Sequence, residues 1–415
     1  MKISLLGQFG SGNSGNDGSL EAMLIYLRRH RPDAELVCIC FNPAIVEARY
    51  NIRALSAGGP ALSSGWAKTL NRLCLKLPRR LALIVTAIGH LNGFDVMIVP
   101  GTGILDDFQE KAFGWPFVIF CWCLLARVCR TKIAFVSIGA GPIKGQLSRW
   151  FLRSAAKMAS YRSYRDIYSL EFMRMLGIDV SNDRRYPDIA FSLPAPSPTA
   201  ERLPGEALRV GVGVMNYHGW RANNEKAAII YQTYIGKIST FICWLLEKGY
   251  RVSLLTGDVA DRRACEDVIQ QLRLKMSEAD IAQIEIGAGR TLHEIMQQIS
   301  KVDLAVVSRY HNLVCALKLN RPTISLGYAR KNDDLMGDFQ QRRYCHHIET
   351  FEVDRLTTVF EEVLDNRESI ERQIVLTNEH WQTQLLEQQQ LLSQQLLLTP
   401  VERQDESPQT SGNAL

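Results

Sequence analysis

The chain has 415 residues, which is too long for a single compact hydrophobic core, so we expect two domains. Its composition is that of a soluble globular protein, with 46% hydrophobic and 22% charged residues and a net charge of +5. A nucleic-acid-binding surface needs Lys and Arg concentrated on one face, and an excess this small and dispersed excludes one. The charge remains compatible with a small anionic substrate or with brief contact with an anionic membrane.

The first half of the chain alternates short apolar runs with segments of helical periodicity. Continuous apolar runs that alternate with helices predict a parallel sheet buried on both faces. The expected strands are residues 2–7, 35–41, 94–101, 132–142 and 161–165, and the expected helices are residues 20–30, 115–128, 148–160 and 167–177.

Two stretches are apolar enough to raise the question of a membrane span. Residues 81–100 are interrupted by His90, Asn92 and Asp95. Residues 115–128 are too short, because a span needs roughly 20 apolar residues. Both are interpreted as buried helix or strand, although the second is apolar enough to rest against a membrane. The residues before the first glycine are too few for a secretion signal, so we expect a cytoplasmic protein, with peripheral association at the inner membrane left open.

The ten cysteines form no C-x-x-C pair. Two C-x-C pairs, at residues 38–40 and 121–123, lie in apolar runs, which is typical of core thiols in a reducing cytoplasm. His346 and His347 are adjacent but have no third ligand nearby in the sequence. We therefore expect no metal site.

Residues 192–206 contain four prolines and interrupt the alternation. We therefore expect an N-terminal domain at 1–195, a Pro-rich linker at 196–206 and a C-terminal domain at 207–365. The second domain repeats the α/β alternation, with segments at 208–214, 251–258, 263–276, 283–289, 291–302, 303–311 and 322–329 after a long helix that ends near 249. Two Rossmann-like domains of this kind form a GT-B-like fold, in which the carboxyl ends of both parallel sheets border a central cleft where ligands bind.

The last part of the chain differs from both domains. Residues 366–398 predict one helix, in which leucines separated by glutamines indicate packing against a neighbour. Residues 399–415 contain almost nothing that could be buried, so we expect a disordered tail.

A glycine-rich loop, GQFGSGNSGNDGS, follows the first expected strand and contains a literal G-x-G-x-x-G match at residues 10–15. A dinucleotide site also needs an acidic residue at the end of the second strand, where this chain has CICFNP. Nicotinamide or flavin binding is therefore disfavoured. The loop still offers backbone N–H groups and a helix N-terminus to the oxygens of an anion or a sugar. Alternatively, it is a flexible loop in which Asp17 or Ser19 caps the helix.

Six short segments follow one another along the chain: GQFGSGNSGND, GTGILDD, SIGAGP, YRDIYS, PDIAF and RYHN. In this order they resemble the motifs of the polysaccharide pyruvyl transferase family, and the resemblance runs from Lys2 to about Gly337. The chain departs from the family pattern at the pair Asn16 and Asp17, at Thr102 and at Asn312.

The resemblance implies an enzyme that transfers pyruvate from phosphoenolpyruvate, a co-substrate, to two hydroxyls of a sugar in a cell-surface polysaccharide precursor. Phosphoenolpyruvate carries a carboxylate and a phosphate, and guanidinium groups can bind both with paired hydrogen bonds. Arg309 and His311 are two residues apart at an expected strand end, so both should point into the cleft. We assign Arg309 to the donor's oxygens and His311 to acid–base work or phosphate contact. By the family match, Arg165 is a second residue that binds the donor's oxygens. Alternatively, Arg165 forms an ion pair with Asp166 or Glu171.

Weaker candidates for substrate binding are Lys144, Gly12, Asn13, Asp17 and His218. No cofactor or metal is required, and the expected acceptor is a saccharide or a lipid-linked oligosaccharide, with no role for nucleic acid.

Two other functions stay open. A GT-B-type glycosyltransferase would bind a nucleotide ribose near Asp333 and Asp334. A non-catalytic relative in polysaccharide assembly is favoured by the long Gln/Leu helix.

Overall fold

The structure is a computed structural model that describes residues 1–59, 77–107, 110–197, 205–219, 224–287 and 289–397. Most of the Pro-rich linker and the tail that we expect to be disordered lie outside the described residues. The exact domain boundaries stay a prediction.

The first sheet has seven parallel strands in the spatial order β3-β2-β1-β4-β5-β6-β7. This is a Rossmann order, in which the direction of winding reverses between β1 and β4. The strands are β1 (Lys2–Leu6), β2 (Glu35–Cys40), β3 (Arg53–Ser56), β4 (Val96–Pro100), β5 (Lys132–Ile138), β6 (Tyr161–Tyr164) and β7 (Arg184–Arg185). The helices are α1 (Ser14–His30), α2 (Pro43–Tyr50), α4 (Leu77–Leu91), α5 (Trp115–Val128), α6 (Gln146–Met158), α7 (Ile167–Met175) and the 3₁₀ turn η1 (Ile189–Ser192).

The second sheet has six parallel strands in the order β10-β9-β8-β11-β12-β13, which repeats the winding of the first. Its strands are β8 (Arg209–Gly213), β9 (Arg251–Leu255), β10 (Glu285–Ile286), β11 (Leu304–Val307), β12 (Thr323–Gly327) and β13 (Cys345–His347). Its helices are α8 (Asn224–Glu247), α9 (Asp261–Leu272), α10 (Glu278–Ile281), α11 (Leu292–Ile299), α12 (Tyr310–Lys318), α13 (Arg330–Asp338), the 3₁₀ turn η2 (Arg342–Tyr344) and α14 (Val353–Asp365). Two parallel sheets of this kind confirm the expected fold class.

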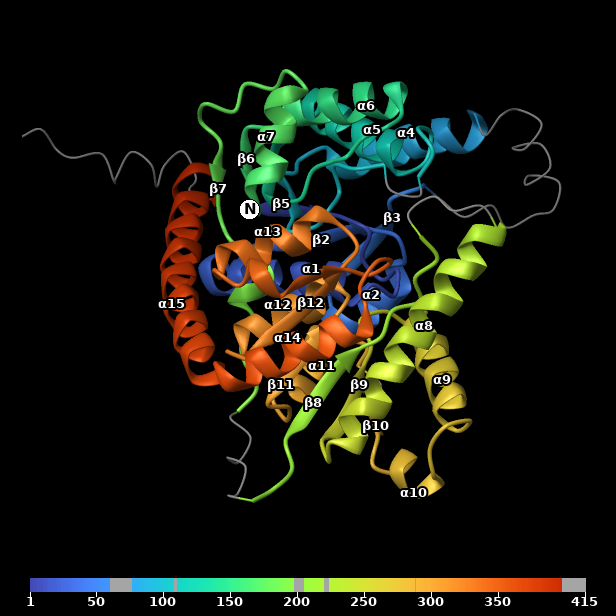
Figure 1. Ribbon diagram of the computed structural model, residues 1–415. Coiled ribbons are helices and arrows are strands. Elements are labelled where there is room, and N and C mark those ends of the chain that lie inside the picture. Colours follow the sequence, from blue (N-terminus) through green and yellow to red (C-terminus); the bar gives the residue numbers. More distant parts are fainter. Residues whose placement is uncertain (60–76, 108–109, 198–204, 220–223, 288, 398–415) are drawn as a thin grey trace, which may run out of the picture.

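Both apolar stretches of the first domain form helices and a strand that pack on its core, as expected, although some of their side chains, such as Val85, Leu124 and Val128, are exposed. Residues 81–100 form most of α4 and the strand β4, and residues 115–128 form α5. Trp122 of α5 is fully buried against the core of the first sheet, with Phe135 of β5. In Figure 1, α4, α5 and α6 lie together on one face of this sheet.

One helix, residues 225–247 of α8, is long and apolar enough to cross a membrane by length and composition alone. Its inward side chains, among them Tyr234, Phe241 and Leu245, are buried in the hydrophobic core of the second domain. We therefore interpret α8 as a core helix.

The glycine loop is shorter than the sequence suggests, because α1 begins at Ser14 rather than near Leu20. The side chain of Asn13 caps the helix and accepts hydrogen bonds from the backbone N–H groups of Gly15 and Asn16. The suggestion that Asp17 or Ser19 caps the helix is therefore wrong, because Asn13 already satisfies the first free N–H groups.

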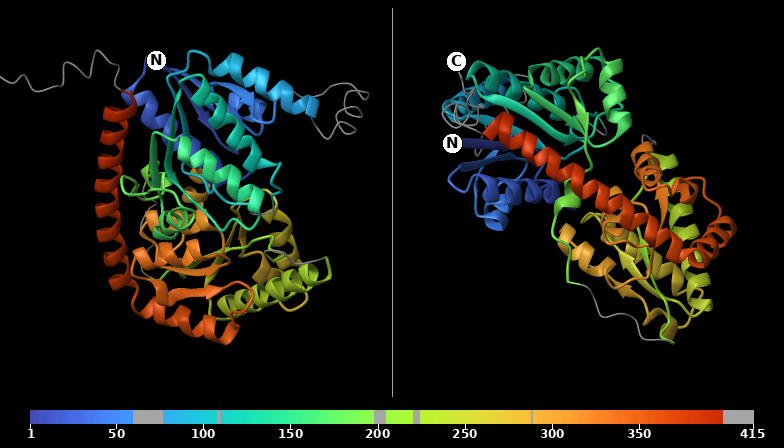
Figure 2. Two further views of the ribbon diagram at one scale, coloured as in Figure 1. Left: turned by 90° about the horizontal axis from the view of Figure 1, so that it is seen from above. Right: turned by 90° about the vertical axis from the view of Figure 1, so that its left-hand side faces the viewer.

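The C-terminal helix α15 (Arg367–Leu392) and the following π-turn η3 (Ser393–Leu397) return to the first domain. Figure 2 shows α15 running alongside both domains. The indole of Trp381 packs between Phe191 of the first domain and Phe339 of the second, with ring centres 4.7 and 4.8 Å away. Further along, the buried side chain of Gln388 donates hydrogen bonds to Ser137 and Ser163 in the first sheet. The neighbour on which the Gln/Leu helix packs is thus its own chain.

Candidate active site

The candidate residues gather where the carboxyl edges of the two sheets face each other. Loops after β1, β4 and β6 meet loops after β9, β11 and β12 around a cavity of about 190 Å³. This is the position at which open α/β sheets bind their ligands. A second cavity of about 400 Å³ adjoins it and shares Gly103, Asp106, Arg165 and Lys331. The lining of the first cavity includes Gln8, Asn13, Asn16, Asp106, Glu110, Trp115, Arg165, Arg309, His311, Tyr328 and Lys331.

Arg165 is the innermost cation of this cavity and comes from the end of β6. Its Nη1 donates to Asp188 Oδ2 at 2.9 Å, and its Nε lies 3.8 Å from Asp166 Oδ2. Its guanidinium carbon lies 4.5 Å from the centre of the Tyr310 ring. Burial opposes the charge, but Tyr310 and the two carboxylates keep the pKa of Arg165 above its ordinary value. The ion pair expected as the alternative role exists, with Asp166 and Asp188 rather than with Glu171.

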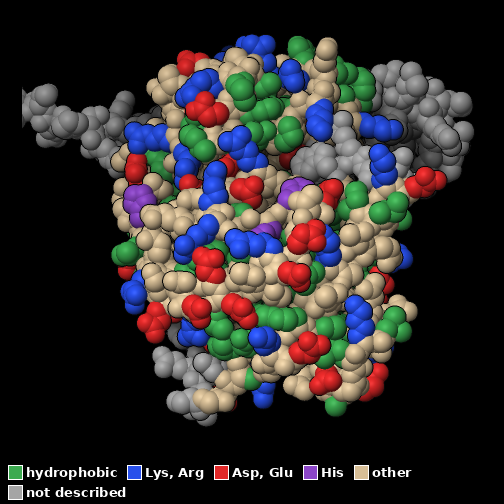
Figure 3. All heavy atoms as spheres, viewed as in Figure 1, with side chains coloured by type: hydrophobic (Ala, Val, Ile, Leu, Met, Phe, Trp, Pro, Cys, Tyr) green, Lys and Arg blue, Asp and Glu red, His purple; other side chains and the backbone are tan. Residues whose placement is uncertain are grey.

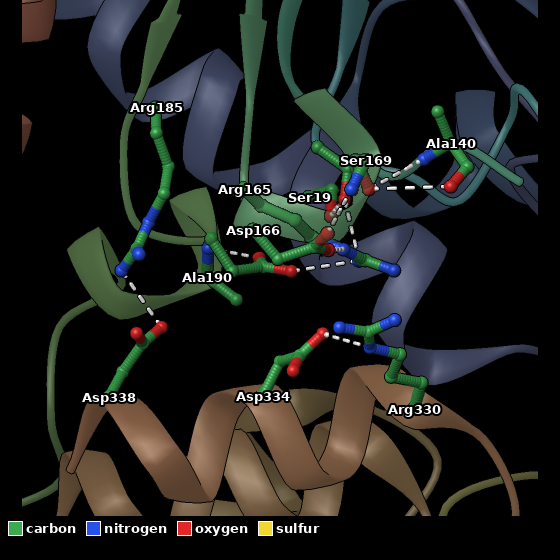
Figure 4. A network of polar contacts seen from close by, with 12 residues as sticks. Ser19, Ala140, Arg165, Asp166, Ser169, Arg185, Ala190, Arg330, Asp334 and Asp338 are labelled. Atoms are coloured by element: carbon green, nitrogen blue, oxygen red, sulfur yellow. Dashed lines mark hydrogen bonds and ion pairs between the residues drawn. The ribbon is translucent and has the colours of Figure 1, made fainter. Parts of the chain in front are cut away.

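Asp188 belongs to the PDIAF segment and forms the closest ion pair with Arg165. Its carboxylate is almost fully buried and also accepts a hydrogen bond from the backbone N–H of Ala190. Burial raises the pKa of Asp188, and the neighbouring Arg165 partly offsets this effect. Figure 4 shows Arg165 and Asp166 facing α13 of the second domain, which carries Arg330 and Asp334.

Arg309 lines the cavity from the second domain, but its local structure differs from the prediction. It is the N-cap residue of α12, and His311 lies in the first turn of that helix, so the expectation that both sit on one side of a strand is wrong. The strand β11 ends at Val307 because the chain turns directly into the helix. Arg309 donates from Nε and Nη2 to the two oxygens of the buried Asp261, at 3.0 and 2.6 Å.

His311 projects from α12 against the glycine loop of the other domain. Its Nε2 is buried without a hydrogen-bond partner among the described residues, and Asp188 Oδ2 lies 3.9 Å away. A Cβ atom at Gly15 would overlap the imidazole ring, so only glycine allows this approach. Burial, together with the charges of Arg165 and Lys331, lowers the pKa of His311 well below its ordinary value.

Tyr328 and Lys331 are among the cavity residues that sequence reasoning missed. They follow β12 in the segment LGYARK, and the same rule that selected Arg309, a strand that ends at the cleft, could have found them. The Lys331 Nζ lies 5.4 Å from the centre of the Tyr328 ring and 5.5 Å from that of Tyr310. Burial alone would raise the pKa of Tyr328, but Lys331 and Arg309 lower it below its ordinary value.

The glycine loop fastens the two domains together. Ser14 Oγ donates to the backbone oxygen of Gly257 at 2.6 Å, and Asn13 forms a β-bridge with Asp258. A Cβ atom at Gly18 would also overlap Leu292 of α11. The bare backbone of the loop thus serves, at least in part, the close approach of one domain to the other.

The remaining predicted residues are dispersed. Asn13 lines the cavity, whereas Gly12 and Asp17 do not. Asp17 is buried, accepts a hydrogen bond from the Gly10 N–H and pairs with Arg49 Nη1 at 2.7 Å. Burial raises the pKa of Asp17, with Gly10 and Arg49 acting in the opposite direction.

Lys144 and His218 also lie apart from the inner cavity. Lys144 is exposed and lines only the adjoining 400 Å³ cavity. His218 is exposed, with its ring stacked on Tyr231 and its Nε2 2.9 Å from Asn216 Oδ1. Within the described ranges, no group of three or more His, Cys, Asp or Glu side chains could hold a metal ion. The roles assigned to all these residues stay predictions.

Solved structures share the fold of the whole chain. A UDP-GlcNAc 2-epimerase from Neisseria meningitidis superposes with a TM-score of 0.57 at 9% identity, over 93% of this chain and 100% of that chain. The epimerase from Methanocaldococcus jannaschii gives 0.56 at 12% identity, over 87% and 92%. A glycosyltransferase from Rickettsia africae gives 0.54 at 10% identity, over 94% and 98%. At these identities the likeness shows a GT-B-like fold alone.

Among curated proteins, no sequence matches the chain. The family model described as polysaccharide pyruvyl transferase matches residues 13–330, which include most strands of both sheets together with Arg165, Arg309 and His311 of the cavity. The match covers well over half of the sequence and confirms the resemblance that the motifs indicate. The chain therefore belongs to the polysaccharide pyruvyl transferase family.

Proposed function

We propose that this protein transfers a pyruvyl group from phosphoenolpyruvate to two hydroxyls of one sugar, forming a ketal in a cell-surface polysaccharide precursor. The observation that supports this proposal most strongly is the convergence of Arg165, Arg309 and Lys331 on one cavity between the domains. Phosphoenolpyruvate carries a carboxylate and a phosphate, and a site that binds both needs several cations within a small volume. Because phosphoenolpyruvate is made in the cytoplasm, the proposal also assigns the reaction to that compartment.

The cations differ in how firmly they are already engaged. Arg165 is held by Asp188, and Arg309 is held by Asp261 through two of its nitrogens. Lys331 has no carboxylate within ion-pair distance among the described residues, so it has the most to gain from an anionic ligand. We propose that Arg309 and Lys331 bind the phosphate and that Arg165, deeper in the cavity, binds the carboxylate.

The chemistry requires three changes at the donor. The methylene carbon of phosphoenolpyruvate gains a proton, a sugar hydroxyl adds to the neighbouring carbon, and the C–O bond to phosphate breaks. The second hydroxyl then closes the ketal. One of the two hydroxyl protons ends on the new methyl group and the other leaves with phosphate, so no oxidant or reductant is needed.

His311 and Tyr328 are the two titratable groups best suited to move these protons. His311 is neutral without ligand because its pKa is lowered, and an adjacent phosphate would favour the protonated form. Tyr328 also lies beside Lys331 and Arg309, which lower its pKa. We propose that one accepts the proton of the attacking hydroxyl while the other donates to the methylene carbon.

The acceptor is proposed to bind on the side of the first domain. There the cavity is lined by neutral amides and carboxylates, including Gln8, Asn13, Asn16 and Glu110. Such side chains form hydrogen bonds with sugar hydroxyls and do not compete for the donor's negative charge. The separation of cations on one side from amides and carboxylates on the other supports a two-substrate site.

Calorimetric titration of phosphoenolpyruvate into the parent protein and into Arg309→Lys tests the proposal. The change keeps the charge but removes the planar fork, so we expect binding to weaken by about 1.5–3 kcal/mol. Arg273→Lys, at an exposed position at the end of α9, is the matched control and should bind like the parent. Equal binding by Arg309→Lys would remove this residue from the donor site.

The same titration separates the other candidate functions. Binding of a nucleotide sugar but not of phosphoenolpyruvate would indicate a glycosyltransferase. For that function, Asp334 is already paired with Arg330 and Arg342. Asp333 and Asp334 both line a neighbouring groove of about 510 Å³, which shares Tyr328 with the inner cavity. Binding of neither ligand would favour a non-catalytic relative, although the tail helix that suggested one packs on its own chain.

A further inference from the structure

The outer face of α5 and α6 exposes large apolar side chains. Phe113, just before α5, is 54% exposed, and Trp150 of α6 is 53% exposed. Leu124 and Leu147 are each 41% exposed. These residues are not isolated, because Phe113 and Trp150 belong to one aromatic cluster centred on Phe151, with ring centres 5.8 and 5.3 Å from it. We call this surface the α5–α6 face.

The same part of the chain is strongly basic. Residues 111–165 contain ten Lys and Arg and no Asp or Glu, whereas the whole chain has 48 basic and 43 acidic residues. The excess that composition alone presents as dispersed is therefore concentrated here, and the rest of the chain is net acidic. The exposed basic residues of this part include Lys111, Arg127, Lys144, Arg149 and Lys157.

The α5–α6 face borders the mouth of the cleft. Trp115, the first residue of α5, lines the inner cavity, and Lys144, two residues before α6, lines the adjoining one. Figure 3 shows hydrophobic side chains gathered over the upper part of the first domain, with Lys and Arg among them. A partner that binds the α5–α6 face would therefore lie beside the entrance to both cavities.

We infer that the α5–α6 face docks the protein onto the surface of an anionic lipid bilayer. Exposed Trp, Phe and Leu insert at the boundary between headgroups and acyl chains, and surrounding Lys and Arg bind anionic headgroups. The charge complementarity favours an anionic bilayer over a second copy of this chain, which would bring two basic faces together. The exposed aliphatic side chains of Leu124 and Leu147 favour acyl chains over nucleic acid, because bases stack on aromatic rings rather than on aliphatic groups.

Docking there has a consequence that rests on the proposed function. An acceptor sugar carried on a lipid anchor would reach the cleft without leaving the membrane, because the bound face and the cavity entrance adjoin. The docking inference itself does not depend on the reaction, since it follows from the exposure and charge of the α5–α6 face.

Sedimentation of the full-length protein with vesicles tests the inference. We expect binding to vesicles of phosphatidylcholine and phosphatidylglycerol, weak binding to phosphatidylcholine alone, and release by salt as electrostatic screening increases. Arg149→Gln with Lys157→Gln should lower the partition coefficient about thirtyfold. Leu147→Ser with Trp150→Ser should lower it more than about tenfold.

Matched controls come from other exposed sites of the same kind. Leu274→Ser, at a residue 83% exposed beyond the end of α9, and Lys301→Gln, after α11, should bind vesicles like the parent. Equal losses in control and test variants would overturn the inference, as would binding that ignores lipid charge. A concentration-dependent dimer abolished by Leu147→Ser with Trp150→Ser would also overturn it, since a second copy would then cover the face.

The vesicle experiment is independent of the proposed reaction. All test variants should bind phosphoenolpyruvate in solution like the parent, because none of the changed residues lines either cavity. Vesicle binding without phosphoenolpyruvate binding would keep the docking inference and remove the proposed function. Phosphoenolpyruvate binding without vesicle binding would do the reverse.

Discussion

The two domains repeat one winding order but present different chemistry at the edge where they meet. The second domain contributes Arg309, His311 and Lys331, whereas the first contributes mainly amides and carboxylates. Arg165 is the exception, a cation from the first domain placed deep in the cavity and held by two carboxylates of its own domain. The fold therefore fixes where ligands bind, and the loop residues decide which substrate each domain holds.

Several contacts hold the facing edges of the two domains in a fixed relative position. The glycine loop of the first domain contacts the second domain directly, and α15 crosses from the second domain back to the first. Ion pairs also cross the cleft, as between Arg185 and Asp338 at 2.8 Å (Figure 4). If the two domains bind different substrates, these contacts are needed to position them, because a shift of about 1 Å between donor and acceptor can slow a reaction about a hundredfold.

The largest expected effect follows from removing the helix that joins the domains. A chain that ends at Asn366 loses α15, including the buried Ile374, Trp381 and Leu385. Each large buried side chain contributes about 2–5 kcal/mol, so the loss should approach the whole free energy of unfolding. Thermal unfolding of this chain should show no cooperative transition at the parent's temperature.

A point variant keeps this prediction testable if the truncated chain is insoluble. Trp381→Ala should lower the free energy of unfolding by about 3–5 kcal/mol, because its indole packs on both domains. A chain that ends at Pro400 is the control and should unfold like the parent, since the polar segment beyond it lacks core-forming residues. A cooperative, parent-like transition in Trp381→Ala would show that α15 does not fasten the domains.

The next effect concerns Arg165, the cation that the first domain contributes to the cavity. Arg165→Met leaves Asp188 and Asp166 buried without a cation, so we expect a loss of about 3–5 kcal/mol in the free energy of unfolding, measured in urea. Adding Asp188→Asn should recover part of that loss, because one of the two uncompensated charges is removed. An Arg165→Met protein as stable as the parent would mean that Arg165 serves the ligand alone.

Much of the fold follows from the sequence. The strands β1, β2, β4 and β5 are continuous apolar runs, and runs of that kind are interpretable without knowledge of distant contacts. The structure around Arg309 could not be predicted in the same way. Arg309 would follow the apolar run whether the strand continued or a helix began, and only the backbone of α12 shows that it is the N-cap residue of a helix. The path of α15 across both domains depends on long-range packing around Trp381, which no local pattern contains.

The site was only partly predictable for a similar reason. Arg165, Arg309 and His311 follow strands or motif positions, and all three line the cavity. Asp17 also lies in one of the matching segments, the glycine loop, but Arg49 of α2 holds it in a buried ion pair away from the cavity. The importance of Gly15 is also non-local, since it depends on a histidine almost three hundred residues later in the sequence.

A smaller expected effect tests the contact between the glycine loop and the second domain. Gly15 lies in α1, where alanine would normally stabilise the helix by about 1 kcal/mol. In this protein the added methyl group overlaps the ring of His311, and such overpacking costs about 1–3 kcal/mol. We expect Gly15→Ala to leave stability within about 2 kcal/mol of the parent while it slows phosphate release in the presence of acceptor.

Gly89→Ala provides the matched control for that change. Gly89 also lies in a helix, α4, but a Cβ atom there would meet nothing within 4 Å. This variant should be as stable as the parent or slightly more stable, with unchanged phosphate release. If Gly15→Ala behaved in the same way, His311 would have room to move and the close approach would carry no function.

The smallest expected effect is the proton balance of donor binding. Burial and the neighbouring cations lower the pKa of His311, so the ligand-free site leaves it neutral at neutral pH. A bound phosphate partly cancels those cations and raises the pKa, so binding should take up a fraction of a proton and strengthen as the pH falls toward the ordinary pKa of histidine, about 6.5. The donor's own phosphate, with a second pKa of about 6, releases protons on binding cations, so the parent must be compared with His311→Gln. Titrations in buffers of different ionisation enthalpy should show less proton uptake in the variant, with most of the affinity retained. Equal proton uptake in the two proteins would exclude His311 as the group that gains a proton when the donor binds.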